Sequence, residues 1–423
     1  MIEDDFYRTS SQFRLWSFTE ESLRSVRQNT NSLASDRVRV ALRRAREARQ
    51  SASSSAVGTP NPNGSDADSK AGEEKDIECL TPEEEQDLVR YFCEQIIQLG
   101  ESYKPPMPTI VRATAIQYLR RFYLTNSPMT YHPKTIMPCA LFIATKTDNY
   151  YMSLRHFADG VPGDTSAEDI ITPEFLVMQS LRFTFDVRHP FRGLEGGIME
   201  LNAISQGLAQ PAPHLQDQTP DDLRRALSSL PPPPNKPNPS SVSDRLAHAH
   251  HNTREILKSA AQMTDAYFLY TPSQIWLSAL SLADQPLANF YLDTKLPNPP
   301  DSNHPFAQLR TKLFQTLTSC SALLDSYKPL ATDPEQKKAM RRIGKKLYHC
   351  QNPEKVNLAG QKRIPAAAAA SAAGAAAALN SETATPDSEM ERLAKKPKLE
   401  AEGKQANDIF GGELVMERTK ERQ

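Results

Sequence analysis

The chain has 423 residues, a formal net charge of −1 and 39% hydrophobic residues, a balance that excludes a membrane protein and a protein that binds polyanions through its overall charge. Its 33 prolines and mean hydropathy of −0.56 predict ordered cores separated by disordered segments. None of the five cysteines forms a CxxC pair, so neither a zinc ribbon nor a disulfide framework is indicated. The acidic start MIEDDFY is not a signal peptide, and we expect an intracellular protein without a membrane anchor.

Residues 1–50 are predicted to form an N-terminal helical extension. A helix is expected to open after Ser17, which forms an S-x-x-E capping box with Glu20. Six arginines follow between Arg37 and Arg49; they are typical of a solvated helix face, and a surface for an acidic partner or for nucleic acid is the alternative. Residues 51–80, mostly rich in serine, glycine, asparagine and aspartate, are predicted to be a disordered linker.

Residues 81–205 show the apolar periodicity of a helical bundle. One stripe recurs at three- and four-residue steps and consists of Val111, Ala115, Tyr118 and Phe122. This stripe predicts that Arg120 and Arg121 face water. A helix starting near Pro133 is apolar nearly all round and should be the central helix of the bundle. A further helix is expected to open at Thr172-Pro173.

The second half of the chain begins with a proline-rich segment and ends with a low-complexity segment. Nine of the 38 residues in 206–243 are proline, which predicts a disordered insertion. Helical periodicity returns over 244–358, where the last helix is amphipathic. Residues 359–423 form a low-complexity tail that is predicted to be disordered. Its KKPK run places Lys395, Lys396 and Lys398 in a predicted nuclear import signal.

Two stretches 139 residues apart share a pattern. YHPKTIMPCALFIA, which starts at Tyr131, matches YTPSQIWLSALSLA, which starts at Tyr270, in tyrosine, proline, isoleucine, alanine and leucine. In the second stretch Thr271 is a good N-cap, Pro272 falls at the first helical position, and Gln274 completes a capping box. A helix should therefore start at each proline. The match predicts an internal duplication and an all-α fold of two tandem repeats.

Four further strings resemble those of the cyclin family, and within it the cyclin H type. They are SSQFRLWSFTEESLRSVRQNTN near the N-terminus, MPTIVRATAIQYLRRFYLTNSPMTYHPKTIM, VRHPFRGLEGGIMEL and TDAYFLYTPSQI. The resemblance implies a tandem pair of five-helix cyclin-box repeats with flanking N- and C-terminal helices. The first box is then assigned to residues 81–205, and the second box with the C-terminal helix to 244–358.

The resemblance also implies a site for a partner kinase. Cyclins hold the mobile helix of their kinase with a lysine and a glutamate, which match Lys146 and Glu174 here. The apolar contacts beside this pair are Met178, Phe183 and Phe185. In place of the K-x-E-E pattern common in the family, this chain has KTDN. Asp148 therefore keeps one of the two acidic charges, and the other is absent. From spacing alone, an ordinary surface ion pair is the alternative.

The function implied is that of a regulatory subunit that activates a cyclin-dependent kinase, with no catalytic residue, metal or cofactor of its own. The expected partners are the catalytic subunit of the CDK-activating kinase, a RING-finger assembly factor and the core of TFIIH. The expected outcome is phosphorylation of CDK activation loops and of the RNA polymerase II tail in the nucleus. Direct binding of nucleic acid is not expected.

Two other readings remain open. Transcription factor IIB uses the same duplicated fold to bind DNA, but the cysteines of its zinc ribbon are missing here and the net charge is near zero. A cyclin of the Mediator or elongation type is the second, against which the YTPSQI string argues.

Overall fold

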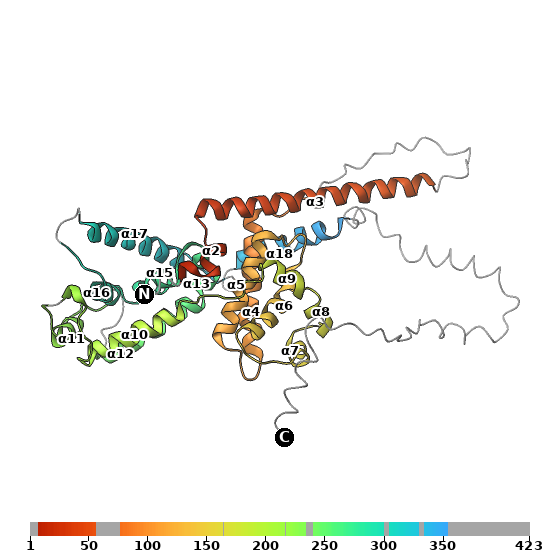
Figure 1. Cartoon of the computed structure of the whole chain (residues 1–423). Helices are drawn as coiled ribbons and strands as arrows, with labels where there is room; N and C mark the ends of the chain where they lie inside the picture. The colour runs from red at the N-terminus through yellow and green to blue at the C-terminus, as the bar shows by residue number, and fades with distance from the viewer. Residues whose placement is uncertain are drawn as a thin grey trace, which may run out of the picture. The chain divides into compact units, whose positions relative to one another are not determined.

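The protein is described by a computed structural model (Figure 1). The described residues are 7–55, 77–163, 165–215, 217–233, 240–299, 304–329 and 334–353. Within these ranges the secondary structure is helical and contains no strand, as the all-α prediction requires. None of the described helices is long and apolar enough to cross a membrane.

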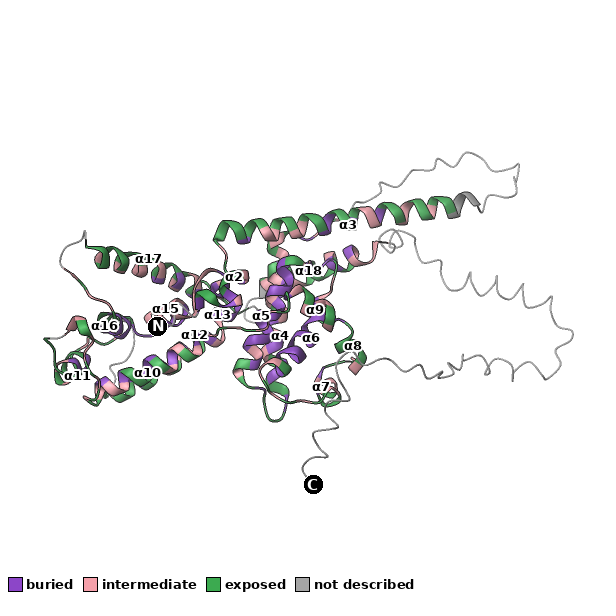
Figure 2. Ribbon diagram, viewed as in Figure 1, coloured by how far each residue is buried: buried purple, intermediate pink, exposed green. Residues whose placement is uncertain are grey.

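Helices α2 and α3 precede the first bundle: α2 spans Ser11–Trp16 and α3 spans Glu20–Ser55. The predicted capping box of Ser17 and Glu20 is wrong. Ser17 is instead the C-cap of α2, and α3 is capped by Thr19 and Ser22, whose hydroxyls and backbone N–H groups bond reciprocally. Because α2 extends to Trp16, Ser17 ends that helix and does not cap the next one. Much of the surface of α3 is exposed (Figure 2).

The first bundle is built around one buried helix. Its elements are α4 (Pro82–Ser102), α5 (Thr109–Thr125), α6 (Pro133–Thr147), α7 (Leu154–Gly160), α8 (Ala167–Ile171) and α9 (Glu174–Ser180). Helix α6 starts at Pro133, as predicted, and Ala140, Leu141 and Ala144 along it are fully buried. The other helices of the bundle cover it, so that α6 forms the centre of the first core.

The second bundle repeats this plan around α15. Its elements are α10 (Phe191–Ser205), the 3-10 turn η1 (Pro213–Leu215), α11 (Pro220–Ser228), α12 (Val242–Lys258), α13 (Ala260–Met263), α14 (Ala266–Leu269), α15 (Pro272–Ala283), α16 (Gln285–Lys295) and α17 (Pro305–Asp325). The predicted capping box forms: Thr271 accepts from the Gln274 backbone, and the Gln274 side chain accepts from the Thr271 N–H at 2.9 Å. Ile275, Ala279 and Leu280 are fully buried.

Helix α10 corrects the assignment of residues 81–205 to the first box. Its buried residues Leu194 and Leu201 belong to the second core, so the first bundle ends before this helix. Gly193 and Gly197 lie against the ring of Trp276 on α15, where an added Cβ would come within 2.6 and 2.7 Å of ring atoms. The glycines therefore allow α10 to approach α15 closely, which a helical periodicity alone does not reveal.

Helix α11 corrects the prediction that 206–243 is disordered throughout. Thr219 and Asp222 form a capping box, Pro220 stands at the first helical position, and Leu223 and Leu227 are buried in the second core. Proline at that position favours a helix, whereas the proline count of the segment suggested none. Residues 234–239 lie outside the described residues.

The C-terminal helix α18 (Pro334–Gln351) packs against the first bundle and α3. Its buried residues Ile343 and Leu347 share a small core with Val38 of α3 and Leu88 of α4. Leu80, which the sequence assigned to the linker, is 2% exposed in the same core, so the predicted linker ends before it. Residues 56–76 of the linker and the tail from 359 lie outside the described residues.

Candidate functional site

Lys146 and Glu174 lie side by side at the surface of the first bundle. The Lys146 Nζ atom is 2.5 Å from Glu174 Oε1 and 4.6 Å from the centroid of the Phe142 ring. The lysine side chain is 48% exposed and the glutamate side chain 21%. A partner that covers this surface can therefore reach both charges. The structure brings the two predicted residues together, and their role in binding a kinase stays a prediction.

The local sequence places each charge at the helix end that suits it. Lys146 is in the last turn of α6, where the helix dipole is negative, and Glu174 opens α9, where the dipole is positive. Asn149, which follows α6, adopts a left-handed backbone with φ of 55° and turns the chain away. These ends meet because α6 and α9 both pack in the first core.

Asp148, the one acidic residue that this chain keeps from the K-x-E-E pattern, does not extend this charged surface. Asp148 is the C-cap of α6, and its Oδ2 atom is buried without a hydrogen-bond partner among the described residues. Burial raises the pKa of Asp148, although a hydrogen bond with Thr114 acts in the opposite direction. Lys146 and Glu174 are thus the charges that this corner presents to a partner.

The chain just after α9 has a strained conformation. Arg182 and Phe183 both have left-handed backbones, with φ of 54° and 53°, which is uncommon for a residue with a large side chain. Trp16 of α2 supports the turn: its ring lies 5.5 Å from the guanidinium carbon of Arg182, and its Nε1 donates to Thr184 Oγ1 at 3.0 Å. The turn leaves the Phe183 side chain 55% exposed.

The three apolar residues predicted beside the ion pair have different environments. Phe183 is open to solvent, Met178 packs half-buried on the first core, and the ring of Phe185 packs edge-on against Tyr118 at 6.2 Å. Sequence reasoning missed Phe175, which is 65% exposed and lies 6.1 Å from the Phe183 ring. The sequence could have predicted that Phe175 is exposed. Val177 marks the side of α9 that faces the core, and Phe175 lies on another side of the helix.

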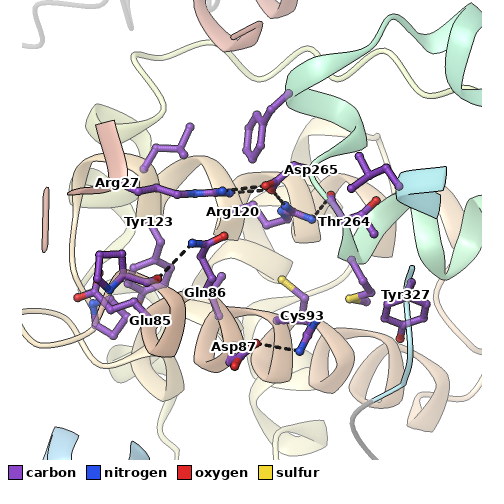
Figure 3. Close-up of a pocket in the computed structure, with 18 of the residues that line it drawn as sticks. Arg27, Glu85, Gln86, Asp87, Cys93, Arg120, Tyr123, Thr264, Asp265 and Tyr327 are labelled. Atoms are coloured by element: carbon purple, nitrogen blue, oxygen red, sulfur yellow. Dashed lines mark hydrogen bonds and ion pairs between the residues drawn. The ribbon is translucent and has the colours of Figure 1, made fainter. Parts of the chain in front are cut away.

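A second cluster of charges joins the two bundles (Figure 3). Asp265 accepts from Arg27 of α3 through both of its oxygens, at 2.7 and 2.8 Å, and from Arg120 of α5 at 2.5 Å. Arg120 also donates to the backbone oxygens of Gln262, at 2.7 Å, and of Thr264. The side chain of Arg120 is only 10% exposed. This cluster fixes α3 and α5 against the start of α14.

Arg120 and Arg121 correct the prediction that this side of α5 faces water. Arg121 is 2% exposed; it lies against the Trp16 ring at 5.2 Å and donates to Gln12 Oε1 at 3.2 Å. The Gln12 oxygen also accepts from the backbone N–H of Arg188, at 2.7 Å, in the segment between the bundles. The polar side of α5 therefore contacts α2, α3 and the second bundle.

Two tandem bundles with equivalent central helices define a protein built from two cyclin boxes, and the comparisons agree. Residues 72–186 match the cyclin N-terminal domain and residues 189–325 match the cyclin C-terminal domain. The chain belongs to the cyclin family. The boundary between the two matches falls just before α10, where the structure also divides the cores.

Its relatives include cyclins of the H type. The chain is 30% identical to Cyclin CCL1 of Saccharomyces cerevisiae over 70% of its own length and 62% of that protein, less than two thirds. It is 28% identical to Cyclin-H of Xenopus laevis over 68% of this chain and 78% of the relative. A solved structure of the CAK complex from Chaetomium thermophilum bound to ATP-gamma-S contains a chain with 30% identity and a TM-score of 0.60, covering 92% of this chain and 99% of that one.

Proposed function

We propose that this cyclin is the regulatory subunit of a CDK-activating kinase and has no catalytic activity of its own. It binds a cyclin-dependent kinase through the surface around Lys146 and Glu174 and holds the mobile regulatory helix of the kinase in its active position. The observation that carries the proposal is the juxtaposition of this exposed ion pair with the exposed rings of Phe175 and Phe183. Likeness to a chain of a CAK complex supports the choice of partner.

The physical argument rests on what docking does to this surface. In the free protein the ion pair is solvated, and such a pair contributes about 0–1 kcal/mol to stability. A docked kinase removes water from the pair, so that each charge becomes a strong donor or acceptor for the partner's backbone. The neighbouring phenylalanines supply apolar area, which residues of this type commonly do at the centre of interfaces.

The proposal also covers the further partners of the complex, its substrates and the compartment in which it acts. The kinase assembles with a RING-finger factor and the core of TFIIH, and it phosphorylates CDK activation loops and the RNA polymerase II tail. The complex acts in the nucleus, and Lys395, Lys396 and Lys398 supply the import signal. These lysines lie outside the described residues, so their part of the proposal rests on sequence.

The test is a charge reversal, Lys146→Glu, measured on the free protein and on its complex with the kinase. We expect the melting temperature of the free cyclin to stay nearly unchanged, while binding weakens by about 2–5 kcal/mol and kinase activation falls accordingly. Lys134→Glu is the matched control, because Lys134 is an exposed lysine at the other end of the same helix. Normal binding by Lys146→Glu contradicts the proposal, and an equal loss in both variants shows only a general effect of charge.

A further inference from the structure

Cys79 and Cys350 meet where three distant segments pack together. Cys79 lies in the segment before α4, and Cys350 lies near the end of α18. Both belong to the small core that includes Val38 of α3. The Cys350 Sγ atom is 3.8 Å from the backbone oxygen of Glu78, the residue before Cys79, so the two cysteines are neighbours in this core. Cys350 is 4% exposed, whereas Cys79 is half-buried and open to small solutes.

The surroundings of Cys79 favour its thiolate. The hydrogen bond with Cys350, a second with Ser35 and the positive charge of Arg39 together lower the pKa of the Cys79 thiol, against the opposing effect of burial. The thiolate is the form that reacts with oxidants. Cysteine reactivity thus differs sharply along the chain, because burial raises the pKa of the other three thiols: to about 12 for Cys93 and Cys139, and to about 11 for Cys320.

We propose that Cys79 and Cys350 form an oxidisable dithiol, with Cys79 as the reactive thiol and Cys350 as the resolving thiol. Peroxide is the oxidant. The Cys79 thiolate attacks one peroxide oxygen, the O–O bond breaks, and a sulfenic acid and hydroxide are formed. The Cys350 thiol then attacks the sulfenic sulfur, forming the S–S bond and releasing water. Two thiols lose two electrons in total, and one peroxide becomes two waters.

The bond would join α18 to the segment before α4 and enclose both cyclin boxes in one covalent loop. Such a link limits the unfolded chain more strongly than the non-covalent contacts of this core do. Because Cys79 is only half-buried, reducing thiols can reach the bond, which is typical of a reversible, redox-sensing disulfide in a reducing compartment.

Peroxide treatment of the folded full-length chain tests the proposal. After oxidation, free thiols are alkylated under denaturing conditions and the peptides are identified by mass spectrometry. We expect a Cys79–Cys350 peptide that has lost two hydrogen atoms and that dithiothreitol separates. Cys93, Cys139 and Cys320 should remain alkylated at the same peroxide dose. Oxidation of those three at the same rate, or oxidation of Cys79 without a link to Cys350, overturns the proposal.

Two variants assign the order of the steps. In Cys350→Ser, peroxide should leave a sulfenic acid at Cys79 that dimedone traps, with no internal disulfide. In Cys79→Ser, Cys350 should remain reduced at the dose that oxidises the wild type. Cys320→Ser, a buried cysteine outside this core, is the matched control and should still form the Cys79–Cys350 bond. A Cys79→Ser chain in which Cys350 is oxidised as fast as in the wild type overturns the assigned roles.

Discussion

Glu85 is a buried carboxyl in the first turn of α4. It is 8% exposed, and it accepts hydrogen bonds from the Ser127 hydroxyl and from Asn31. Burial raises the pKa of Glu85 from an ordinary 4.5 to about 7, although both hydrogen bonds act in the opposite direction. A carboxyl with a raised pKa contributes stability that is fully present below about pH 4.5 and is lost as the pH rises through about 7.

We therefore predict that Glu85→Gln makes the protein more stable at pH 8 and nearly unchanged at pH 5. The difference between the two pKa values corresponds to roughly 3 kcal/mol, which the wild type should lose over this range and the variant should keep. The amide oxygen still accepts from Ser127, so the local packing is retained. Urea unfolding at both pH values measures the effect. Glu83→Gln, an exposed neighbour in the same helix turn, is the control and should leave the pH profile unchanged.

The arginines of α5 show which residues a single sequence misplaces. The stripe of Tyr118 and Phe122 predicted one buried side of the helix correctly, since both residues are fully buried. Arg121 is buried as well and the Arg120 side chain is only 10% exposed, because other parts of the chain cover the opposite side and supply acceptors. Periodicity reports the polarity of one helix, whereas the partners of a charged side chain come from segments more than 100 residues away. The pairing of Lys146 with Glu174 was predicted through the family resemblance, and its role in binding a kinase stays a prediction.

At the scale of elements, helix starts were more predictable than helix partners. The duplicated pattern fixed the starts of α6 and α15, because a proline after an N-cap is a local signal. The core to which α10 belongs depends instead on the contact of Gly193 and Gly197 with Trp276, which no local pattern encodes. The capping box at Thr219 was present in the sequence, and the high proline content around it obscured the signal.

Helix α11 gives a direct test of how firmly the proline-rich segment packs on the second core. Leu227 is 1% exposed, so Leu227→Ala should destabilise the protein by about 2–5 kcal/mol through lost burial and the cavity left behind. Leu208 precedes α11 in the same segment and is 69% exposed, so Leu208→Ala should stay within about 0.5 kcal/mol of the wild type. Thermal and urea unfolding compare the two. Equal effects would mean that α11 adds nothing to the second core.

At the scale of the whole molecule, the tail is predicted to direct nuclear import and to contribute nothing to the stability of the fold. Removal of residues 366–423 should leave the stability within about 0.5 kcal/mol, since the two cores and α18 lie before it. The truncated chain should shift to the cytoplasm when its kinase is absent. Replacement of Lys395, Lys396 and Lys398 by alanine in the full chain is the sharper variant, and import should fail there too. Nuclear accumulation of both variants without the kinase would exclude the tail as the signal.

The contact between the two boxes includes one carboxylate that is shared by two arginines. Asp265 binds Arg27 and Arg120, and loss of its charge leaves two guanidinium groups side by side (Figure 3). Burial alone would raise the pKa of Asp265, but the hydrogen bonds and charges of the two arginines lower it overall. A carboxylate with a lowered pKa contributes stability that is present above its ordinary value, near 3.8, and is lost as the pH falls through its value in the folded protein.

Asp265→Asn should therefore uncouple the boxes at neutral pH. We expect a loss of about 3 kcal/mol, near the lower end for a broken buried ion pair because the carboxylate is 24% exposed. Each box has its own hydrophobic core, so the variant should unfold in a broader transition than the wild type, or in two transitions, in calorimetry. As the pH falls from the ordinary pKa near 3.8 through the lower pKa of the folded protein, the wild type loses this stability, so the difference between the two proteins should shrink. Asp186→Asn is the control, since Asp186 forms a half-exposed ion pair with Arg188 between the bundles and should cost at most about 1 kcal/mol. An Asp265→Asn protein that unfolds like this control, in one sharp transition at neutral pH, would show that contacts other than those of Asp265 hold the boxes together.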